Sequence, residues 1–433
     1  MSVTLLETRK KLGGRATSFE DVRTGLVIDN CQHVAMGCCT NYLDLCRRLD
    51  ALDKIRWQKE TYWVEAGGRT SVLRPGLLPA PAHFAWSFIR ASFLSTREMH
   101  RITKAMCDIV GADRTEFAEI TFGTWLERQR QSAAVVRKFW APIVISACNL
   151  DPSEVSASVA LHVFQEGFLA HRDAALVGVA AVPLVELYDA AEGALKSAGG
   201  ELRLGCGVAK VFANHVMTTD GRRFDADAIV CAVPPERATR LAHDSLHSAD
   251  PRFRQIAGIR HSPILGVHLT FDRPVLPLHS AVLVERDTQW LFRKDEAGAR
   301  VHAVISAADS WLALTEDEIT RRVLEDIHEC FPPAREAKLL TSRPVKEKLA
   351  TYAPTPDVEA LRPPTLGPLG RRGVILAGDY VQTGWPATME GATRSGYMAA
   401  AAILDRDPSE LLAPSLKPAW LYRLLSPARA ATS

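Results

Sequence analysis

The residues with the clearest capacity for chemistry lie near the C-terminus, where a glycine and an acid end an apolar run. Residues 374–377 are apolar, Gly378 and Asp379 follow, and a loop with glycine and proline leads to a second apolar stretch from Met389. This pattern predicts a buried strand, a flexible loop and a helix beginning near Met389. Backbone N–H groups at such a helix N-terminus can bind ligand phosphates. Asp379 would be placed to accept hydrogen bonds from ligand hydroxyls.

A second group of candidate residues lies at the N-terminus. The short apolar run of residues 3–6 ends at Glu7, and Gly13, Gly14 and Arg15 follow. In a dinucleotide-binding βαβ unit the second strand ends in an acid that binds ribose, about twenty residues after a G-x-G-x-x-G fingerprint. Six residues precede Glu7, and the fingerprint does not occur elsewhere in the sequence. Glu7 is therefore predicted to end the second strand of a unit whose first strand and turn are missing.

Composition and missing motifs exclude several classes of protein. The chain has 433 residues, 47% of them hydrophobic, and a net charge of +2, which favours a globular protein of two or three domains over a nucleic-acid binder. The sequence contains no G-x-S-x-G elbow, no Walker loop and no metal-ligand motif, so hydrolase, nucleotide-hydrolysing and metalloenzyme chemistry lack their parts. Nine cysteines without a CxxC pair, and no signal peptide, indicate reduced thiols in the cytoplasm.

The stretch of residues 373–392 resembles, nearly residue for residue, the C-terminal flavin motif of the amine oxidase and carotenoid desaturase superfamily. Within that superfamily the chain is most similar to the squalene-associated desaturases, the hydroxysqualene dehydroxylases. The resemblance extends from residue 3 to about residue 404 and is strongest at 3–33, 164–188 and 374–398. It implies that the cofactor is FAD.

The resemblance also implies which residues bind that cofactor. In relatives the strand matching residues 25–29 ends in Asp-x-Gly-Gln-His, with Gln-His near the flavin ring; here Cys31 replaces the glycine and is followed by Gln32 and His33. The expected FAD-binding residues are Glu7, Gly13, Gly14, Arg15, Gln32, Val208, Gly378, Asp379, Trp385, Pro386, Ala387, Thr388 and Met389. No metal site is expected.

The expected fold class is α/β. A Rossmann-like FAD-binding domain without its first βα unit would comprise residues 1–70, 184–235 and 365–405. An α+β substrate domain with a mixed sheet and a helical insertion would comprise 71–183 and 236–364, with 406–433 as a tail.

Loss of the central first strand of the FAD-binding domain would leave unpaired backbone groups and remove the helix N-terminus for the pyrophosphate. We therefore expect that the gene's true start codon lies upstream of the codon for Met1.

The resemblance implies that hydroxysqualene is reduced to squalene, in hopanoid and triterpenoid supply. Hydride from reduced FAD would reach an allylic carbon as the hydroxyl leaves as water. Protonation of the leaving group needs a positioned acid. His33 is the candidate by position, Glu166 and His171 are others, and a buried structural role is an equal alternative for His33. Oxidative desaturation of a phytoene-type carotenoid precursor remains an alternative, as does a non-catalytic remnant that binds lipid or a partner.

Two segments have the composition of chains that lie at a lipid interface. Residues 77–94 combine Trp86 and several phenylalanines with prolines and Arg90, and residues 416–429 mix three cations with Trp420 and leucines. No run of eighteen apolar residues occurs, so no transmembrane helix is predicted. We expect a cytoplasmic protein that contacts the inner face of a membrane and takes an apolar triterpenoid; helices packed on their own protein are the alternative.

Overall fold

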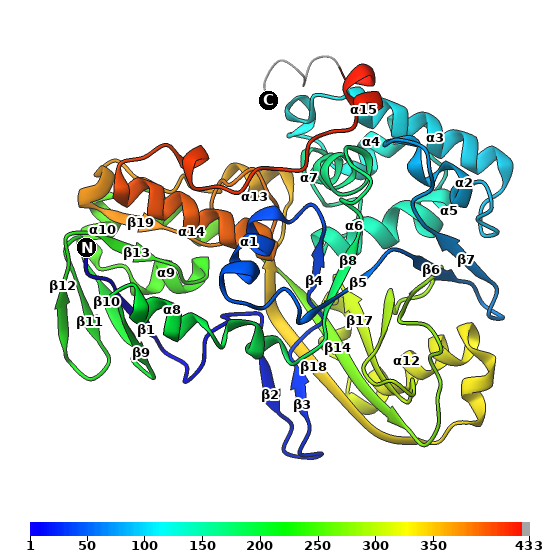
Figure 1. Cartoon of the computed structure of the whole chain (residues 1–433), viewed down its shortest axis with the longest axis horizontal. Helices are drawn as coiled ribbons and strands as arrows, with labels where there is room; N and C mark the ends of the chain where they lie inside the picture. The colour runs from blue at the N-terminus through cyan, green and yellow to red at the C-terminus, as the bar shows by residue number, and fades with distance from the viewer. Residues whose placement is uncertain (427–433) are drawn as a thin grey trace.

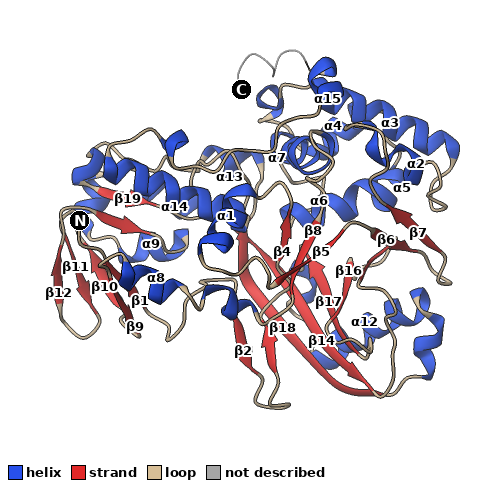
Figure 2. Cartoon of the chain, in the orientation of Figure 1, coloured by secondary structure: helices blue, strands red, loops and turns tan. Residues whose placement is uncertain are grey.

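The computed structural model describes residues 1–426 (Figure 1). Strands that lie far apart in the sequence pair with one another, and helices pack around them. Figure 2 shows the strands in two regions, one at the left beside the N-terminus and one at the lower right beneath a group of helices. The predicted α/β fold with a large mixed second sheet is confirmed.

Two parallel strand pairs form the part of the fold predicted to bind a dinucleotide. Strand β1 (Thr4–Glu7) pairs with β9 (Glu201–Leu204), and β13 (Ile229–Cys231) pairs with β19 (Val374–Leu376). Within residues 1–426 no ladder of hydrogen bonds joins one pair to the other. Strand β19 is buried along its whole length, as its uninterrupted apolar sequence requires. The neighbouring elements are α8 (Ala191–Ser197), β10 (Val208–Val211), β11 (His215–Thr218) and β12 (Arg223–Asp225).

Three short helices after β13 pack on this unit, although the sequence placed their residues in the substrate domain. Their buried residues Ala238, Leu246 and Phe253 share one hydrophobic core with Val374 and Leu376 of β19. Apolar spacing predicts a buried helix face but not which core that face covers. The helices are α9 (Pro235–Leu241), α10 (Asp244–Ala249) and α11 (Arg252–Gln255).

A seven-stranded sheet forms the centre of the second region. Its strand order is β18-β14-β17-β16-β15-β6-β7, with antiparallel neighbours except for the parallel β15–β6 pair. The sequence placed residues 61–70 with the FAD-binding domain, yet the β6–β7 hairpin extends this sheet because β6 pairs with β15. The strands are β6 (Thr61–Val64), β7 (Thr70–Leu73), β14 (His261–Phe271), β15 (Ser280–Leu283), β16 (Trp290–Arg293), β17 (Arg300–Ser306) and β18 (Leu339–Tyr352).

One long helix covers the core of this sheet. Helix α12 (Glu316–Cys330) begins with a capping box in which Thr315 and Glu318 bond to each other's backbone N–H groups. Its residues Ile319, Val323 and Ile327 are buried in one cluster with the inward-facing residues of the sheet. Their spacing of four residues places them on one face of the helix.

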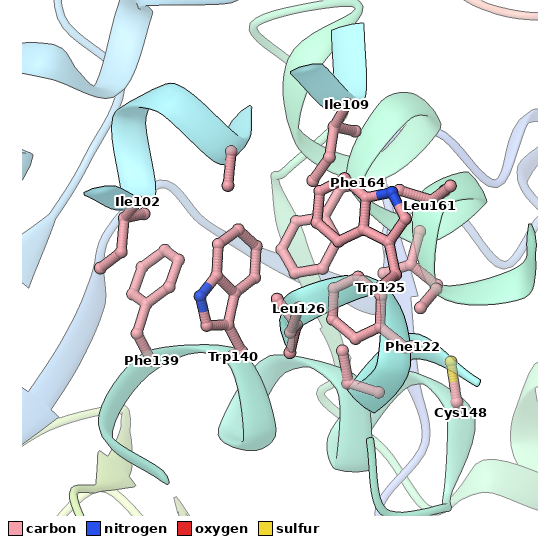
Figure 3. Packing of buried hydrophobic residues seen from close by; sticks show 14 of the residues in the cluster. Ile102, Ile109, Phe122, Trp125, Leu126, Phe139, Trp140, Cys148, Leu161 and Phe164 are labelled. Atoms are coloured by element: carbon pink, nitrogen blue, oxygen red, sulfur yellow. The ribbon is translucent and has the colours of Figure 1, made fainter. Parts of the chain in front are cut away.

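A group of helices rich in aromatic residues forms the upper right of the molecule in Figure 1. Figure 3 shows its core, where the rings of Phe122, Trp140 and Phe164 meet at centroid distances of 5.0–5.9 Å. The indole N–H of Trp140 donates to the side chain of Gln131 (3.1 Å), which satisfies the polar end of this buried ring. The helices are α2 (Ala85–Phe88), α3 (Thr96–Gly111), α4 (Phe122–Arg128), α5 (Ala133–Val135), α6 (Ala141–Cys148) and α7 (Ala157–Phe164).

The remaining elements connect these regions. Helix α14 begins at the residue predicted for it, Met389, and packs against α1. The elements are β2 (Ser18–Glu20), β3 (Val27–Asp29), β4 (Val34–Met36), α1 (Thr40–Arg48), β5 (Ile55–Gln58), β8 (Val177–Ala180), α13 (Pro356–Ala360), α14 (Met389–Leu404) and α15 (Trp420–Leu425). None of the helices in the described chain has both the length and the apolar content needed to cross a membrane.

Candidate active site

The two chemically distinctive ends of the chain meet at one ion pair. The guanidinium of Arg15 bonds to the carboxylate of Asp379, 364 positions away in the sequence. Arg15 also donates to the backbone carbonyl of Ala350 (2.9 Å), at the end of β18. The side chain of Asp379 is 7% exposed, whereas that of Arg15 is 31% exposed. The structure therefore places a cation with free hydrogen-bonding surface beside the strand–loop–helix motif, as a phosphate group would require.

The glycine turn before Arg15 has a backbone that other residues cannot easily adopt. Gly13 has φ of +109° and Gly14 has φ of +59°. A Cβ atom on Gly13 would lie 2.6 Å from the carbonyl oxygen of Ala16, while nothing lies within 4 Å of a Cβ on Gly14. The side-chain amide of Asn30 donates to the Arg15 carbonyl (3.0 Å) and so fixes the end of the turn. The turn forms a tight, side-chain-free cradle next to Arg15.

We expect the substitution Gly13→Ala to weaken FAD binding at least tenfold, because the new Cβ displaces the turn and strains its backbone. The matched control is Gly25→Asn, in the β2–β3 turn outside the predicted site, since asparagine tolerates the left-handed region (φ of +68° at Gly25) and this Cβ has open space. Titration of the deflavinated protein with FAD, followed by flavin fluorescence, measures both affinities. Equal affinities for the two variants would show that the shape of the turn does not control binding.

Glu7 and Val208 lie at the same end of the β1–β9 pair. The backbone carbonyl of Glu7 accepts from the N–H of Cys206 (2.8 Å), in the turn between β9 and β10, and Val208 begins β10. One carboxylate oxygen of Glu7 accepts from the backbone N–H of Arg9 (2.7 Å). An acid at the end of a parallel strand can receive ribose hydroxyls, which is the role predicted for it.

Local hydrogen bonds fix the conformation of the loop from Gly378 to Met389. The N–H of Gly378 donates to the hydroxyl of Ser395 on α14 (2.7 Å), and Thr388 caps α14 by accepting from the N–H of Gly391 (3.0 Å). Trp385 meets the ring of His162 edge-on, with centroids 4.8 Å apart. Because His162 lies on α7, this contact joins the predicted flavin loop to the helical group. Pro386 and Ala387 connect Trp385 to Thr388, the residue that caps the helix.

Arg362 organises this loop and was not found from the sequence. Its buried guanidinium donates to four consecutive or nearby carbonyls of the loop, and it bonds to the carboxylate of Glu359 (2.9 Å). The accepting carbonyls are those of Asp379 (3.3 Å), Tyr380 (3.3 Å), Val381 (2.6 Å) and Trp385 (2.7 Å). No local pattern indicates this role, because the accepting carbonyls lie 17 to 23 positions further along the chain.

Gln32 and His33 belong to a second polar cluster, which also includes residues of the seven-stranded sheet. The ammonium of Lys294 bridges the carboxylate of Asp29 (3.0 Å) and the side-chain oxygen of Gln32 (3.4 Å). The ring of His268 contacts the Asp29 carbonyl through Nε2 (2.8 Å) and stacks on His302 at 3.9 Å. Lys294 was not predicted, because its partner Asp29 is 265 positions away.

The environment of His33 sets its protonation. Its Nδ1 lies 3.2 Å from the carbonyl oxygen of Cys31, and because a carbonyl only accepts, Nδ1 carries the hydrogen. Burial lowers the pKa of His33. Nε2 of the neutral ring is then an acceptor, so His33 donates from this nitrogen only after it gains a proton. Its role as the acid stays a prediction.

The other two acid candidates lie on other elements. Glu166, in the π-helical turn that continues α7, pairs with Arg114 at 3.4 Å, and it follows His162 by one turn. His171 lies in the loop before β8, with Nδ1 4.0 Å from the carboxylate of Asp173. Among the residues described, no cluster of three or more metal-ligating side chains is found.

The sequence and fold are similar to those of known oxidoreductases. The family model described as flavin containing amine oxidoreductase matches residues 1–404. A hydroxysqualene dehydroxylase from Sinorhizobium fredii is 28% identical over 432 residues, which cover 94% of this chain and 93% of that protein. A 15-cis-phytoene desaturase from an Oncidium hybrid cultivar is 25% identical over 439 residues, 93% of this chain and 73% of that protein. An oxidoreductase from Methanosarcina mazei matches in structure with a TM-score of 0.69 at 16% identity, covering 94% of each chain.

The fold, together with the glycine turn at Gly13 and the segment of Gly378 that the Arg15–Asp379 ion pair brings together, defines a flavin-dependent oxidoreductase. The chain belongs to the flavin containing amine oxidoreductase family, and its cofactor is FAD. The residues present suit that group: a glycine cradle without side chains, a partly exposed arginine for the pyrophosphate and acids at two strand ends for hydroxyls.

Proposed function

We propose that this flavoenzyme reduces hydroxysqualene to squalene. The observation that supports this most directly is the match to a hydroxysqualene dehydroxylase, which spans nearly the whole of both chains. The motif of residues 373–392 and the segment of residues 164–188 resemble the same group of enzymes. The overall reaction replaces a carbon–oxygen bond by a carbon–hydrogen bond: hydride and one proton are consumed, and the hydroxyl leaves as water.

In this proposal the chain's residues position the cofactor and protect the substrate. FAD, when bound, supplies the hydride. Gly13, Gly14 and Arg15 would hold its pyrophosphate and Glu7 its ribose, while Asp379 would accept from the hydroxyls of its linker. The loop from Trp385 to Thr388 would lie along its ring system. The helical group around the core of Trp140 and Phe164 would supply apolar surroundings for a long hydrocarbon, because an allylic cation must be protected from water.

Three side chains are candidates for the donor of the proton to the leaving hydroxyl. His33 remains the first candidate, and it would donate from Nε2 after protonation, with Nδ1 held by the Cys31 carbonyl. Glu166 is the second, because its helix turn follows the His162–Trp385 contact. His171 is the third, in the loop that follows this segment. An acid in this role contributes about 10²–10⁴-fold to the rate.

Oxidative desaturation of a carotenoid precursor is the second candidate function. It is favoured by the 25% identity to a 15-cis-phytoene desaturase over 93% of this chain. The hydride would then move from substrate to oxidised cofactor, and no leaving group would need a proton.

The two functions are distinguished by products formed under opposite redox conditions. The purified chain, loaded with FAD, is incubated anaerobically with hydroxysqualene and a chemical reductant of the flavin, and separately with phytoene and an electron acceptor; products are identified by mass spectrometry. We expect squalene in the first reaction, turnover lowered about 10²–10⁴-fold in His33→Gln if this ring is the acid, and no change in His100→Gln, at an exposed histidine of α3. Desaturated phytoene without squalene would reject the proposal, and protein that stays colourless with FAD would identify a non-catalytic remnant.

A further inference from the structure

The segment of residues 77–90 exposes large apolar side chains and buries some of its polar ones, which is the opposite of what is usual for a segment in contact with water. Leu77 is 99% exposed and Trp86 is 59% exposed, and Leu78 and Ile89 are also exposed. Two uncharged polar side chains of the same segment point inward, whereas Arg90 is exposed. Ser87 is buried, and its hydroxyl bonds to both the N–H (3.1 Å) and the carbonyl (2.9 Å) of Arg74. His83 is buried too. This inward anchoring holds the large apolar side chains outward, where water is an unfavourable environment for them.

Helix α15 repeats this arrangement in the C-terminal segment. Trp420 is 61% exposed and Leu424 is 69% exposed, while Tyr422 between them is buried in the aromatic core of the helical group. The N–H of Ala419 donates to the carbonyl of Ala170 (2.8 Å), which fixes the start of the helix. The part of the predicted interfacial tail beyond residue 426 lies outside the described residues.

The two segments, far apart in sequence, line one groove. The groove has a volume of about 430 Å³. It is lined by Leu77, Leu78, Pro79 and Ala80 of the first segment, by Lys417, Ala419 and Trp420 of the second, and by His171 and Arg172. In Figure 1, α15 lies at the outer end of the helical group. The start of each segment therefore lies beside the other, and we call the two segments together, residues 77–90 and 416–425, the outer face.

The charge of the outer face has one sign. Residues 77–94 and 411–426 contain no aspartate or glutamate, although the chain has 50 acidic residues. They carry Arg90, Lys417 and Arg423, all exposed. The guanidinium of Arg90 lies 3.9 Å over the ring of Trp86, so a cation and an exposed aromatic ring share one position. Tryptophan beside arginine or lysine suits the boundary between lipid headgroups and acyl chains.

We propose that the outer face docks the protein on the anionic surface of a lipid bilayer. Trp86, Leu77, Trp420 and Leu424 would enter the boundary of the acyl chains, and Arg90, Lys417 and Arg423 would meet lipid phosphates. A protein partner is less well matched, because a flat apolar surface for a protein needs no excess of one charge, whereas anionic lipid does. The groove between the two segments places this contact beside the helical group.

Co-sedimentation of the full chain with vesicles tests the docking without substrate or turnover, so its outcome is independent of the proposed reaction. Vesicles of phosphatidylcholine mixed with phosphatidylglycerol are compared with phosphatidylcholine alone. We expect Leu77→Glu and Trp420→Glu each to weaken binding to the mixed vesicles at least tenfold. The matched control is Val22→Glu, at an apolar side chain that is 94% exposed in the β2–β3 hairpin, and it should bind as the parent does.

The electrostatic part is tested with two neutral variants. Lys417→Gln and Arg423→Gln should each weaken binding to mixed vesicles about fivefold, and added salt should reduce this difference. Arg321→Gln, an exposed cation on α12, should have no effect. Far-UV circular dichroism checks that each variant is folded. A parent chain that binds neither vesicle type, or variants that bind as the parent does, would overturn the proposal. So would a parent dimer in light scattering that Trp420→Glu converts to a monomer without changing vesicle binding.

Discussion

Replacing Arg362 by methionine is expected to destabilise the protein by about 3–5 kcal/mol and to abolish FAD binding at micromolar cofactor. The guanidinium is 5% exposed, and it bonds to four loop carbonyls and to the carboxylate of Glu359. Methionine has a similar volume but donates no hydrogen bond. The substitution therefore leaves buried carbonyls and a carboxylate without their donor, which costs more than the net value of the bonds themselves.

The effect on FAD follows from the position of the same carbonyls. They belong to the loop from Asp379 to Trp385, and their bonds to one guanidinium fix the conformation of this loop. Without it, the Asp379 carboxylate and the N-terminus of α14 lose their fixed separation. A lysine at this position keeps the charge but reaches fewer acceptors than the fork of a guanidinium, so Arg362→Lys should fall between the parent and Arg362→Met.

Urea denaturation gives the free energy of unfolding for each variant, and FAD titration gives the affinity. The matched control is Arg371→Met in the same part of the chain, where a half-exposed guanidinium lies 3.3 Å from Asp405. Such a surface pair contributes at most about 1 kcal/mol. If Arg362→Met and Arg371→Met unfold at the same urea concentration, the role assigned to Arg362 is wrong.

Acid is expected to destabilise the protein steeply between pH 6.5 and pH 4, because buried histidines must stay neutral in the folded chain. Burial lowers the pKa of His83 to about 4 and that of His268 to about 4, from an ordinary value of 6.5. Burial lowers the pKa of His302 as well, and the charges of His268 and Lys294 act in the same direction. The lowered pKa means that the unfolded chain binds more protons than the folded chain in this window.

The sign and size of the effect follow from that difference in bound protons. The free energy of unfolding rises with pH by about 1.4 kcal/mol per pH unit for each histidine that is neutral when folded and charged when unfolded. Each of His83 and His268 therefore removes about 3 kcal/mol as the pH falls from 6.5 to 4. Glu390 and Asp326 oppose this trend, because burial raises the pKa of both carboxyls and protonation of the folded state then favours folding.

A single substitution isolates the histidine contribution. His302→Gln removes one titrating ring that has no exposure, next to the stacked ring of His268. We expect the slope of unfolding free energy against pH, measured by urea denaturation at several pH values, to fall by about 1.4 kcal/mol per unit relative to the parent. His100→Gln, at an exposed site on α3, should keep the parent's slope. A parent slope of zero in this window would contradict the buried, neutral state of these rings.

Local patterns were sufficient for several elements of the fold and of the site. The apolar run before Gly378, the start of α14 at Met389 and the whole of α12 follow from periodicity and capping, which depend on residues close together in the chain. Gly13 was assigned to the cofactor from the resemblance, and its positive φ explains why the residue types that fit there are restricted. Resemblance over most of the chain then identified FAD.

Only the tertiary structure decided which distant residues meet. Arg15 pairs with Asp379, Arg362 gathers the carbonyls of another segment, and Lys294 bridges Asp29 and Gln32, yet no periodic pattern links any of these positions. The limits of the domains could not be predicted from local patterns either: β6 joins the sheet of β15, and α9 to α11 pack on β19. The reason is that close packing depends on the shapes of the two surfaces and not on their nearness in sequence. A sequence specifies each apolar face locally, but the neighbour that buries it depends on how the whole chain packs.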